Sequence, residues 1–575
     1  MAPPPLLACV ELSMSHSTLG ISSNRDVLIA IEAFLDYSPL WTLSQAAIKG
    51  HRHLLERIAC RQPFDQLDPF FRQWIYTKAM AQAASSGRLA FMKWLTTQFP
   101  RCFVTVAVEE AAANGHLAVL QWLLGNHPDV KWGADEMNYA LRNNHFQVAQ
   151  WLYQHVPQSA EREMKAAAAE SGSLEMVKWA FAVWPPLHDG GSVEQNYDIT
   201  AIMAAALRSG SAPVVEWIAN NRGQQSLEFT SLDEAAVLGH FDVIKWMTEH
   251  NLGRCSNECL EKTGANGHFE LAKWMFDNRS DGCGNYPKDS VASQGNVEIV
   301  KWFAEKTGPM CFSDSAMDLA AANGHLNVVR YLHDSGYGCS DVAMDDAATN
   351  GHLEIVKFLH DNRTEGCTTA AMDGAAKNGR LDVIEWLHEH RREGCTDFAM
   401  NLAAENNHRH VVQWLHENRT EGCTDWALTG AATGGHLEML KWLQEHRHLS
   451  YSGSSPVNPV DLAAGGGHLE AFRWLIDTQG VHPTSAAMAF AVEQKQFEML
   501  LILRSEFGVR PTDIIFLQAI QRKELEILQW LLHHFPDAVG QRTLVRSLFT
   551  TTSWHVRHWL RDNGYLDDGR TLRVA

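Results

Sequence analysis

The chain has 575 residues, of which 45% are hydrophobic and 20% charged, a composition that excludes a collagen-like or wholly disordered protein. Lys and Arg number 48 against 67 Asp and Glu, so the formal net charge of −19 disfavours nucleic-acid binding, because phosphates would be repelled over most of the surface. No apolar run reaches the roughly 18 residues that cross a bilayer, and the N-terminus lacks the positively charged start of a secretory signal. We therefore expect a soluble cytoplasmic protein, with a nuclear location as the alternative, that binds neither nucleic acid nor membrane.

In chain order, residues 1–28 are rich in Pro and Ser and are expected to form a disordered tail. We expect divergent capping repeats over residues 29–80, a repeat array over residues 81–530, and a C-terminal capping repeat and tail over residues 531–575. Two insertions, near 184–197 and 449–459, carry the Pro, Gly and Ser of loops. Insertions often gather on the binding face of a repeat protein, yet long loops cost little stability, and the neutral interpretation is favoured.

A repeat of 28 residues organises most of the chain. It is clearest in GCSDVAMDDAATNGHLEIVKFLHDNRTE from Gly338 and in the copies that start at Gly366 and Gly394. An Ala-rich segment ends at a turn residue, here Gly351, and a second segment follows with apolar residues at helical spacing, which predicts a helical hairpin. The turn marker falls at Gly87, Gly115, Asn144, Gly172, Gly210, Gly239, Gly267, Gly295, Gly324, Gly351, Gly379, Asn407, Gly435 and Gly467, with weaker copies around Lys495 and Lys523. One hairpin cannot bury its apolar face alone, so the copies must stack into an all-α solenoid of about 16–18 repeats.

Tryptophan marks one slot of this repeat, seven residues after the turn. The slot holds Trp94, Trp122, Trp151, Trp179, Trp217, Trp246, Trp274, Trp302, Trp386, Trp414, Trp442, Trp474, Trp530 and Trp559. Its fixed place beside Leu favours packing between repeats over a ligand-stacking surface. We predict that Trp386→Ala costs about 3–5 kcal/mol, as deletions of core aromatics do. N-caps for the first helices are expected at Asp341, Thr369, Asp397 and Asp425.

The segments AATNG, NGHLEIVKFL and NGHLAVLQWLL resemble ankyrin repeats, and the resemblance extends over roughly residues 45–560. It implies a solenoid of helical hairpins that binds other proteins. The period of 28 is shorter than the usual value of about 33, so the β-hairpin fingers between repeats should be shortened or absent. AMD replaces the TPLH tetrapeptide of the family and puts Asp318, Asp345 and Asp373 where the family has His. The short unit resembles the expanded ankyrin-like proteins of oomycete-type microbial eukaryotes.

The cysteines and histidines also follow the repeat. Cys255, Cys283, Cys311, Cys339, Cys367, Cys395 and Cys423 recur every 28 residues. Equivalent positions of stacked helices lie about 8–10 Å apart, beyond the reach of a disulfide, so these cysteines are expected to be small buried thiols. A histidine follows the turn marker in many repeats, where we expect a turn hydrogen bond: His116, His145, His240, His268, His325, His352, His408, His436 and His468.

No motif supports catalysis. Walker-type, HExxH and GxSxG patterns are missing from the sequence. Cys255 and Cys259, with His250 and His268, have the residue types of a zinc site, but no second pair follows at zinc-finger spacing. We therefore predict no catalytic residue, no metal and no cofactor, and interpret the chain as a non-enzyme.

The ankyrin resemblance implies partner contacts from the residues before the turn and from those that open the first helix. Carried onto this chain, the first group is Thr349, Asn350, Lys377, Asn378, Glu405, Asn406 and Thr433, and the second is Val342, Ala370, Phe398 and Trp426. The opening slot varies from small to aromatic, and adjacent Phe398 and Trp426 would suit an interface hot spot. Drift on a solvated face is the alternative.

We thus predict a monomeric scaffold or adaptor that binds a protein partner, a basic one being the easier to accommodate. The alternatives are an effector that engages a foreign host protein and, in another class, an enzyme with an unrecognised site in the N-terminal region.

Overall fold

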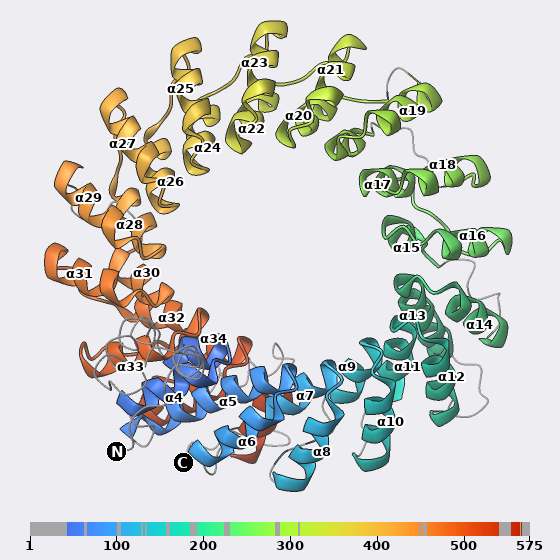
Figure 1. Ribbon diagram of the computed structural model, residues 1–575, viewed down its shortest axis with the longest axis vertical. Coiled ribbons are helices and arrows are strands. Elements are labelled where there is room, and N and C mark those ends of the chain that lie inside the picture. The colour runs from blue at the N-terminus through green and yellow to red at the C-terminus, as the bar shows by residue number, and fades with distance from the viewer. Residues whose placement is uncertain are drawn as a thin grey trace, which may run out of the picture. The chain divides into compact units, whose positions relative to one another are not determined.

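Figure 1 shows the computed structural model, which is built of paired helices. It describes residues 43–61, 66–99, 105–127, 130, 132, 135–156, 161–184, 193–222, 230–281, 288–308, 311–447, 449, 451, 457–539, 554–563 and 565. They belong to two compact units, unit 1 (1–167 with 495–575) and unit 2 (168–494). Within these described ranges, β pairing is limited to one isolated bridge between Ser231 and Arg254. The prediction of an all-α fold with shortened or absent β-hairpin fingers is therefore confirmed.

Unit 1 contains hairpins from both ends of the sequence. Its N-terminal helices are α3 (Leu43–Ile48), α4 (Arg52–Arg61), α5 (Pro69–Ser85), α6 (Leu89–Gln98), α7 (Thr105–Ala113), α8 (Leu117–Asn126), α9 (Glu136–Arg142), α10 (Phe146–His155) and the start of α11 (Glu161–Glu170). Its C-terminal elements are α33 (Phe497–Ser505), α34 (Asp513–Gln521), α35 (Leu525–His534), the 3₁₀ helix η6 (Pro536–Ala538) and α37 (Trp554–Asp562). The expected tail over residues 1–28 lies outside the described residues.

Unit 2 is an uninterrupted run of hairpins. Its elements after α11 are α12 (Leu174–Val183), α13 (Val193–Ser209), α14 (Ala212–Arg222), α15 (Asp233–Val237), α16 (Phe241–Glu249), α17 (Cys259–Ala265), α18 (Phe269–Asn278), η5 (Asp289–Gln294), α19 (Val297–Thr307), α20 (Asp314–Ala322), α21 (Leu326–Asp334), α22 (Val342–Asn350), α23 (Leu353–Asn362), α24 (Ala370–Lys377), α25 (Leu381–His390), α26 (Asp397–Glu405), α27 (Arg409–Asn418), α28 (Asp425–Thr433), α29 (Leu437–Arg447), α30 (Pro459–Gly466), α31 (Leu469–Gln479) and α32 (Ser485–Glu493). Most of the two expected insertions lies outside the described residues.

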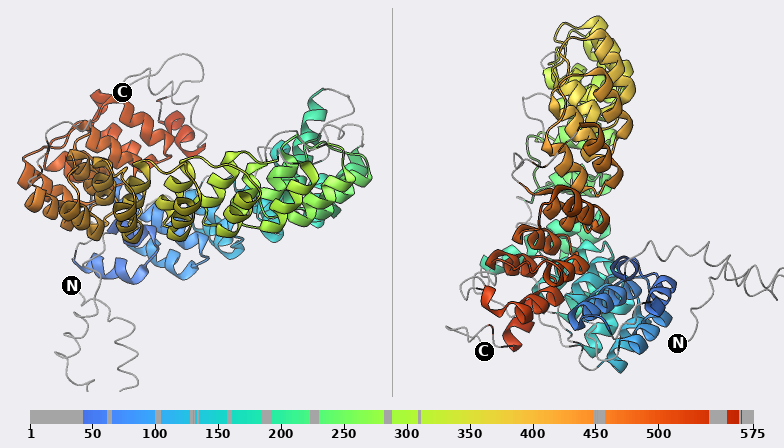
Figure 2. Two further views of the ribbon diagram at one scale, coloured as in Figure 1. Left: turned by 90° about the horizontal axis from the view of Figure 1, so that it is seen from above. Right: turned by 90° about the vertical axis from the view of Figure 1, so that its left-hand side faces the viewer.

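Successive elements pair into seventeen hairpins within the described residues, in agreement with the predicted number of repeats. In unit 2 the first helices, such as α22, α24 and α26, pack directly on one another along the inner edge of the curved stack, and their partners lie along its outer edge (Figures 1 and 2). Small side chains permit this approach, since Ala343, Ala347 and Ala348 of α22 are fully buried. Ile355, Val356 and Leu359 of α23 complete the core of that repeat, as the helical spacing predicts.

The turn marker has a left-handed backbone in every repeat, which explains the residues found there. Gly351 has φ of 84°, and Asn407, Lys495 and Lys523 have φ between 60° and 61° at the same position. Glycine adopts this conformation without strain. At Gly379 a Cβ atom would also approach Nδ1 of His408, in the next repeat, to 2.6 Å. The marker therefore both ends the first helix and leaves room for the neighbouring repeat.

In the clearest repeats the capping hydroxyl belongs to the residue before the one that the sequence suggested, although Asp341 and Thr369 do hold the N-cap positions of α22 and α24. The hydroxyl of Thr396 accepts a hydrogen bond from the backbone N–H of Phe398 at 3.1 Å, so Asp397 is the first residue of α26 and not its cap. Thr424 caps α28 in the same way, and Ser340 and Thr368 serve α22 and α24. The expected caps Asp341 and Thr369 make no side-chain capping bond. The capping oxygen thus belongs to the Ser or Thr directly after the repeat cysteine.

The two ends of the sequence pack together inside unit 1. Helix α5 lies against α35. The ring of Phe497, from the first turn of α33, meets those of Phe71 and Trp74 of α5 edge to face, with centroids 5.4 and 6.0 Å away. Trp530 of α35 contacts the same Phe497 ring at 5.8 Å. These aromatic side chains are buried, so the C-terminal repeats share one core with an N-terminal repeat.

Candidate protein-binding surface

Phe398 and Trp426 form an exposed aromatic pair on two neighbouring repeats. Each side chain is 50% exposed, and the ring centroids lie 6.4 Å apart in an edge-to-face arrangement. They occupy the second positions of α26 and α28. At the corresponding first residues of α22 and α24, Val342 is 44% exposed and Ala370 is also exposed. The variable slot predicted from the sequence is therefore a surface row, apolar in all four repeats.

A ladder of buried and half-buried carboxylates holds the helix ends that carry this row. Asp373 accepts hydrogen bonds from the backbone N–H and the hydroxyl of Thr396 in the next repeat, at 2.8 and 2.7 Å. Asp345 binds Thr368 in the same way, at 2.8 and 2.6 Å. These bonds fix the residue that caps the following first helix. The position of Phe398 is thus set by Asp373, through Thr396.

The same contact recurs throughout unit 2, six residues before the turn marker. Other copies join Asp289 to Ser313, Asp318 to Ser340, Asp461 to Thr484 and, with a longer side chain, Glu261 to Ser290. Asn401 replaces the acid in one repeat, accepting from the N–H of Thr424 and donating to its hydroxyl, both at 3.0 Å. Burial raises the pKa of Asp345 and Asp373, against the lowering effect of their threonine partners. The Asp of the AMD sequence therefore joins adjacent repeats.

Several of the residues before the turn make hydrogen bonds that support the fold, and most of them are also exposed to solvent. The amide of Asn350 donates to the Ala322 carbonyl, and that of Asn378 to the Thr349 carbonyl, both at 2.8 Å in the preceding repeat. The hydroxyls of Thr349 and Thr433 donate hydrogen bonds to backbone carbonyls of their own helices. Thr349 is half-buried, and the other six residues are exposed: Asn350, Lys377, Asn378, Glu405, Asn406 and Thr433. The amide of Asn406 bonds to its own helix. Of the predicted contacts before the turn, only Lys377 and Glu405 present a charge to solvent.

The repeated histidines join neighbouring repeats, as the turn prediction implies. Nε2 of His116 lies 3.0 Å from the Ser85 carbonyl, and that of His325 lies 2.8 Å from the Ser293 carbonyl. The aromatic residue of the Trp slot also contacts the neighbouring repeat: the rings of Trp386 and of His360 in the preceding repeat meet edge to face, with centroids 5.3 Å apart. Trp386 is half-buried, whereas Trp530 is fully buried. Packing, and not ligand stacking, accounts for both residue types.

The repeat cysteines are free, and their environment disfavours reactivity. Cys339 and Cys395 are buried, and Cys367 is half-buried. Burial raises the pKa of each of these thiols to about 11, so little thiolate is present at neutral pH. Two ion pairs lie beside these cysteines, one between Arg363 and Glu365 and one between Arg391 and Glu393. Cys9, Cys102 and Cys283 lie outside the described residues.

The histidines do not join Cys255 and Cys259 as zinc ligands. His250 stacks on Trp246 at 4.1 Å, and its Nδ1 lies 2.8 Å from the Trp246 carbonyl. His268 lies over the turn at Gly239. The group that offers metal-ligating atoms together in the described part of the chain contains Asp233 in their place. Asp233 belongs to the preceding repeat, so its sequence position does not indicate that it lies beside these cysteines.

Within the described ranges, no helix combines the length and apolar content that a membrane crossing requires. The fold and the ladders between its hairpins define the class: a helical repeat protein in which neighbouring units are joined by side chains at fixed positions. Family models of ankyrin repeats match residues 344–425 and 400–487 as three-copy arrays, and residues 108–152, 260–304 and 317–360 as many-copy arrays. The chain therefore contains ankyrin repeats over these residues.

Other comparisons add little. No curated protein matches the sequence. Among solved structures, the chain is similar to the pentatricopeptide repeat protein PPR10 from maize, with 13% identity, 96% of this chain and 91% of that chain covered, and a TM-score of 0.28. The structure of PPR10 in complex with an 18-nt psaJ RNA element gives 13% identity, coverage of 96% and 98%, and a TM-score of 0.26. The RNA is a ligand of that protein, and a likeness at these TM-scores carries no conclusion about this chain.

Proposed function

We propose that this protein is a non-enzymatic scaffold or adaptor that binds a protein partner through the first-helix row of Val342, Ala370, Phe398 and Trp426. The observation that carries the proposal is the exposed aromatic pair at its centre. Large aromatic side chains are enriched at interface hot spots, and two of them side by side give an anchor of the size that such hot spots use. The carboxylate ladder holds the row in place before binding, which lowers the entropic cost of association.

Charge indicates the kind of partner. Asp341 directly precedes Val342 and is exposed, and Asp397 directly precedes Phe398. The whole chain carries a formal charge of −19. A partner that packs an apolar side chain against the two rings and flanks it with Lys or Arg would match both features.

Proximity labelling in the native cell tests the proposal. The full-length protein and the double variant Phe398→Ala with Trp426→Ala are compared, with Ile514→Ala as the control because Ile514 is 64% exposed on another first helix. We expect one abundantly labelled protein to be lost with the double variant and retained with the control. Equal labelling by all three proteins would contradict the assignment of this surface.

A further inference from the structure

A cluster of two thiols and a carboxylate lies between two successive hairpins of unit 2. Asp233 opens α15, Cys255 lies in the connection that follows α16, and Cys259 opens α17. Their ligand atoms, one from each residue, lie within 4.8 Å of one another. Cys259 is fully buried and Cys255 is 9% exposed, so the cluster is screened from bulk water on most sides.

Two members of the cluster depart from the repeat pattern. Cys259 stands four residues after the repeat cysteine, where other repeats have the buried alanines Ala343, Ala371, Ala399 and Ala427. Asp233 is a member of the carboxylate ladder, and its Oδ1 accepts from the backbone N–H of Ser256 at 2.8 Å, as the ladder predicts. Its carboxylate also takes part in the group with the two sulfur atoms, a role that the other ladder carboxylates of the described residues do not have. The packing of this repeat does not require a second thiol.

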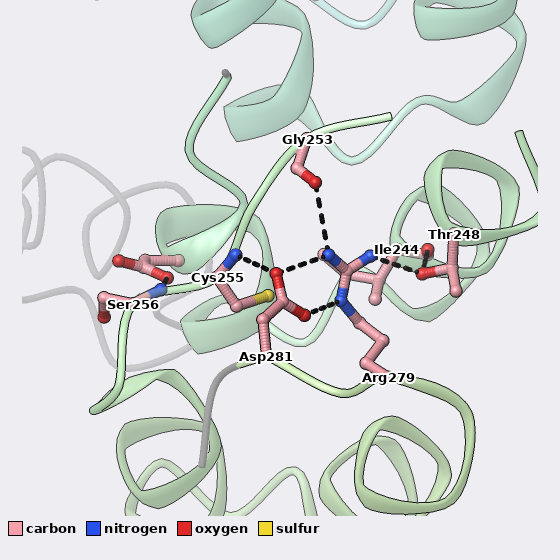
Figure 3. Close-up of polar contacts among 8 residues, drawn as sticks. Ile244, Thr248, Gly253, Cys255, Ser256, Arg279 and Asp281 are labelled. Atoms are coloured by element: carbon pink, nitrogen blue, oxygen red, sulfur yellow. Dashed lines mark hydrogen bonds and ion pairs between the residues drawn. The ribbon is translucent and has the colours of Figure 1, made fainter. Parts of the chain in front are cut away.

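The surrounding residues hold the cysteine-bearing loop in a fixed shape. The backbone N–H of Cys255 donates to Asp281 Oδ2 at 2.9 Å (Figure 3). The buried guanidinium of Arg279 pairs with both oxygens of Asp281, at 2.8 and 2.9 Å, and also donates to the Thr248 hydroxyl and the Gly253 carbonyl. Such an outer shell orients ligands before a metal arrives.

We propose that Asp233, Cys255 and Cys259 bind one Zn²⁺ ion, with a water molecule as the fourth ligand. Two thiolates select a thiophilic ion such as Zn²⁺ over Mg²⁺ or Ca²⁺, which prefer oxygen ligands. A tetrahedral ion with bonds of about 2.3 Å to sulfur and about 2.1 Å to oxygen brings ligand atoms within about 4 Å of each other, so the side chains need only close inward slightly. On binding, both thiols release their protons to solvent and their sulfur atoms donate electron pairs to the metal.

The ion would join two repeats whose first helices are short. Helix α15 has 5 residues and α17 has 7, against 9 for α20, α22 and α26. Short helices bury less apolar surface, and an ion held by both repeats would compensate by tying them together. The expected role is therefore structural and independent of the partner-binding row.

Cobalt titration of the full-length protein tests the site. The reduced chain is stripped of metal with a chelator and titrated with Co²⁺, whose thiolate charge-transfer absorption reports sulfur ligands. We expect one Co²⁺ per chain, displaced by Zn²⁺. Cys259→Ala, which restores the residue of the other repeats, should weaken binding by at least about 100-fold, because even the loss of an outer-shell partner costs 10–100-fold. Asp233→Asn should weaken it as well. The matched control is Cys395→Ala, a repeat cysteine outside the cluster, which should bind as the wild type does.

Thermal melting provides a second readout. The chelator should lower the melting temperature of the wild type and of Cys395→Ala, but not that of Cys259→Ala. The proposal fails if the wild type shows no thiolate charge transfer or if Cys259→Ala titrates like the wild type. It also fails if the reduced protein takes no metal and oxidation instead links Cys255 to Cys259, since the pair would then be a redox pair.

Discussion

Trp74 donates its indole N–H to the carboxylate of Glu524 across 3.0 Å, although the two residues are 450 positions apart in the sequence. Lys78 and Lys495 reach the other oxygen of Glu524, at 2.9 and 2.8 Å. Glu524 is only 2% exposed, so its charge depends on these partners. The carboxylate of Glu524 thus binds residues from both the N-terminal and the C-terminal part of unit 1.

Removal of this carboxylate should destabilise unit 1. We expect Glu524→Ala to lower the free energy of unfolding by about 3 kcal/mol, because two lysines and a buried indole N–H lose their partner. Chemical denaturation followed by tryptophan fluorescence measures the change. Glu438→Ala removes an exposed ion pair with Lys441 and should leave the midpoint unchanged. Equal midpoints for the two variants would refute the role of Glu524.

Neutralising the neighbouring Glu526 should not destabilise the fold at neutral pH, in contrast to neutralising Glu524. Burial raises the pKa of Glu524, but Lys78 and Lys495 outweigh it and hold that pKa below its ordinary value. Its contribution to stability is therefore present above the unfolded-state pKa and is lost as the pH falls through the folded-state pKa. Burial raises the pKa of Glu526, which lies 2.6 Å from the Thr77 hydroxyl, so its contribution is present below the unfolded-state pKa and is lost as the pH rises through the folded-state pKa.

At pH 7 we consequently expect Glu524→Gln to lower the denaturation midpoint and Glu526→Gln to leave it unchanged or raise it. Denaturation curves at pH 7 and pH 4 measure both effects. A lower midpoint for Glu526→Gln at pH 7 would show that the ionised form is the stabilising one.

The carboxylate ladder predicts a difference between two substitutions of Asp373. Asp373→Ala leaves the N–H and hydroxyl of Thr396 without their acceptor and should cost about 2 kcal/mol. Asp373→Asn should cost less than about 0.5 kcal/mol, since Asn401 makes both bonds in the next repeat. Equilibrium denaturation of the two variants measures the difference, and similar losses for both would argue against the hydrogen-bonding role.

Two tryptophans of the same repeat slot should differ in their contribution to stability. Trp530 is fully buried, and Trp530→Ala should cost about 3–5 kcal/mol. Trp386 is half-buried, packed on His360 and His390, so Trp386→Ala should cost about 2 kcal/mol, less than its sequence pattern alone suggested. Urea denaturation of both variants tests the order, and a larger loss for Trp386→Ala would reverse the assignment of exposed and buried positions.

The periodicity predicted the hairpins and the exposed slot because both are local consequences of a regular pattern. The left-handed turn at Gly351, the buried Ala343 and the exposed Phe398 each follow from one position in a repeated unit. The carboxylate ladder left a readable signal: a Ser or Thr follows five of the seven repeat cysteines, and an acidic residue often lies six residues before the turn, as with Thr396 and Asp373. Its pairing was missed because it joins two repeats, 23 residues apart.

Contacts that break the pattern could not be predicted in this way. Nothing periodic relates Trp74 to Glu524, because their contact depends on how the chain returns to unit 1. Asp233 was overlooked beside Cys255 and Cys259 because it belongs to the preceding repeat. His250 was considered only because it lies close in sequence, and its ring packs on Trp246 instead.

The proposed binding surface is tested most sharply by the affinity of the purified full-length protein for the partner identified by labelling. Calorimetric titration should show that Phe398→Ala with Trp426→Ala weakens binding by at least about 30-fold, as the loss of hot-spot residues does. The melting temperature should stay unchanged, because both side chains are half exposed. Undiminished affinity in the double variant would contradict the claim, and a lower melting temperature would place the aromatic pair in the fold and not in the interface.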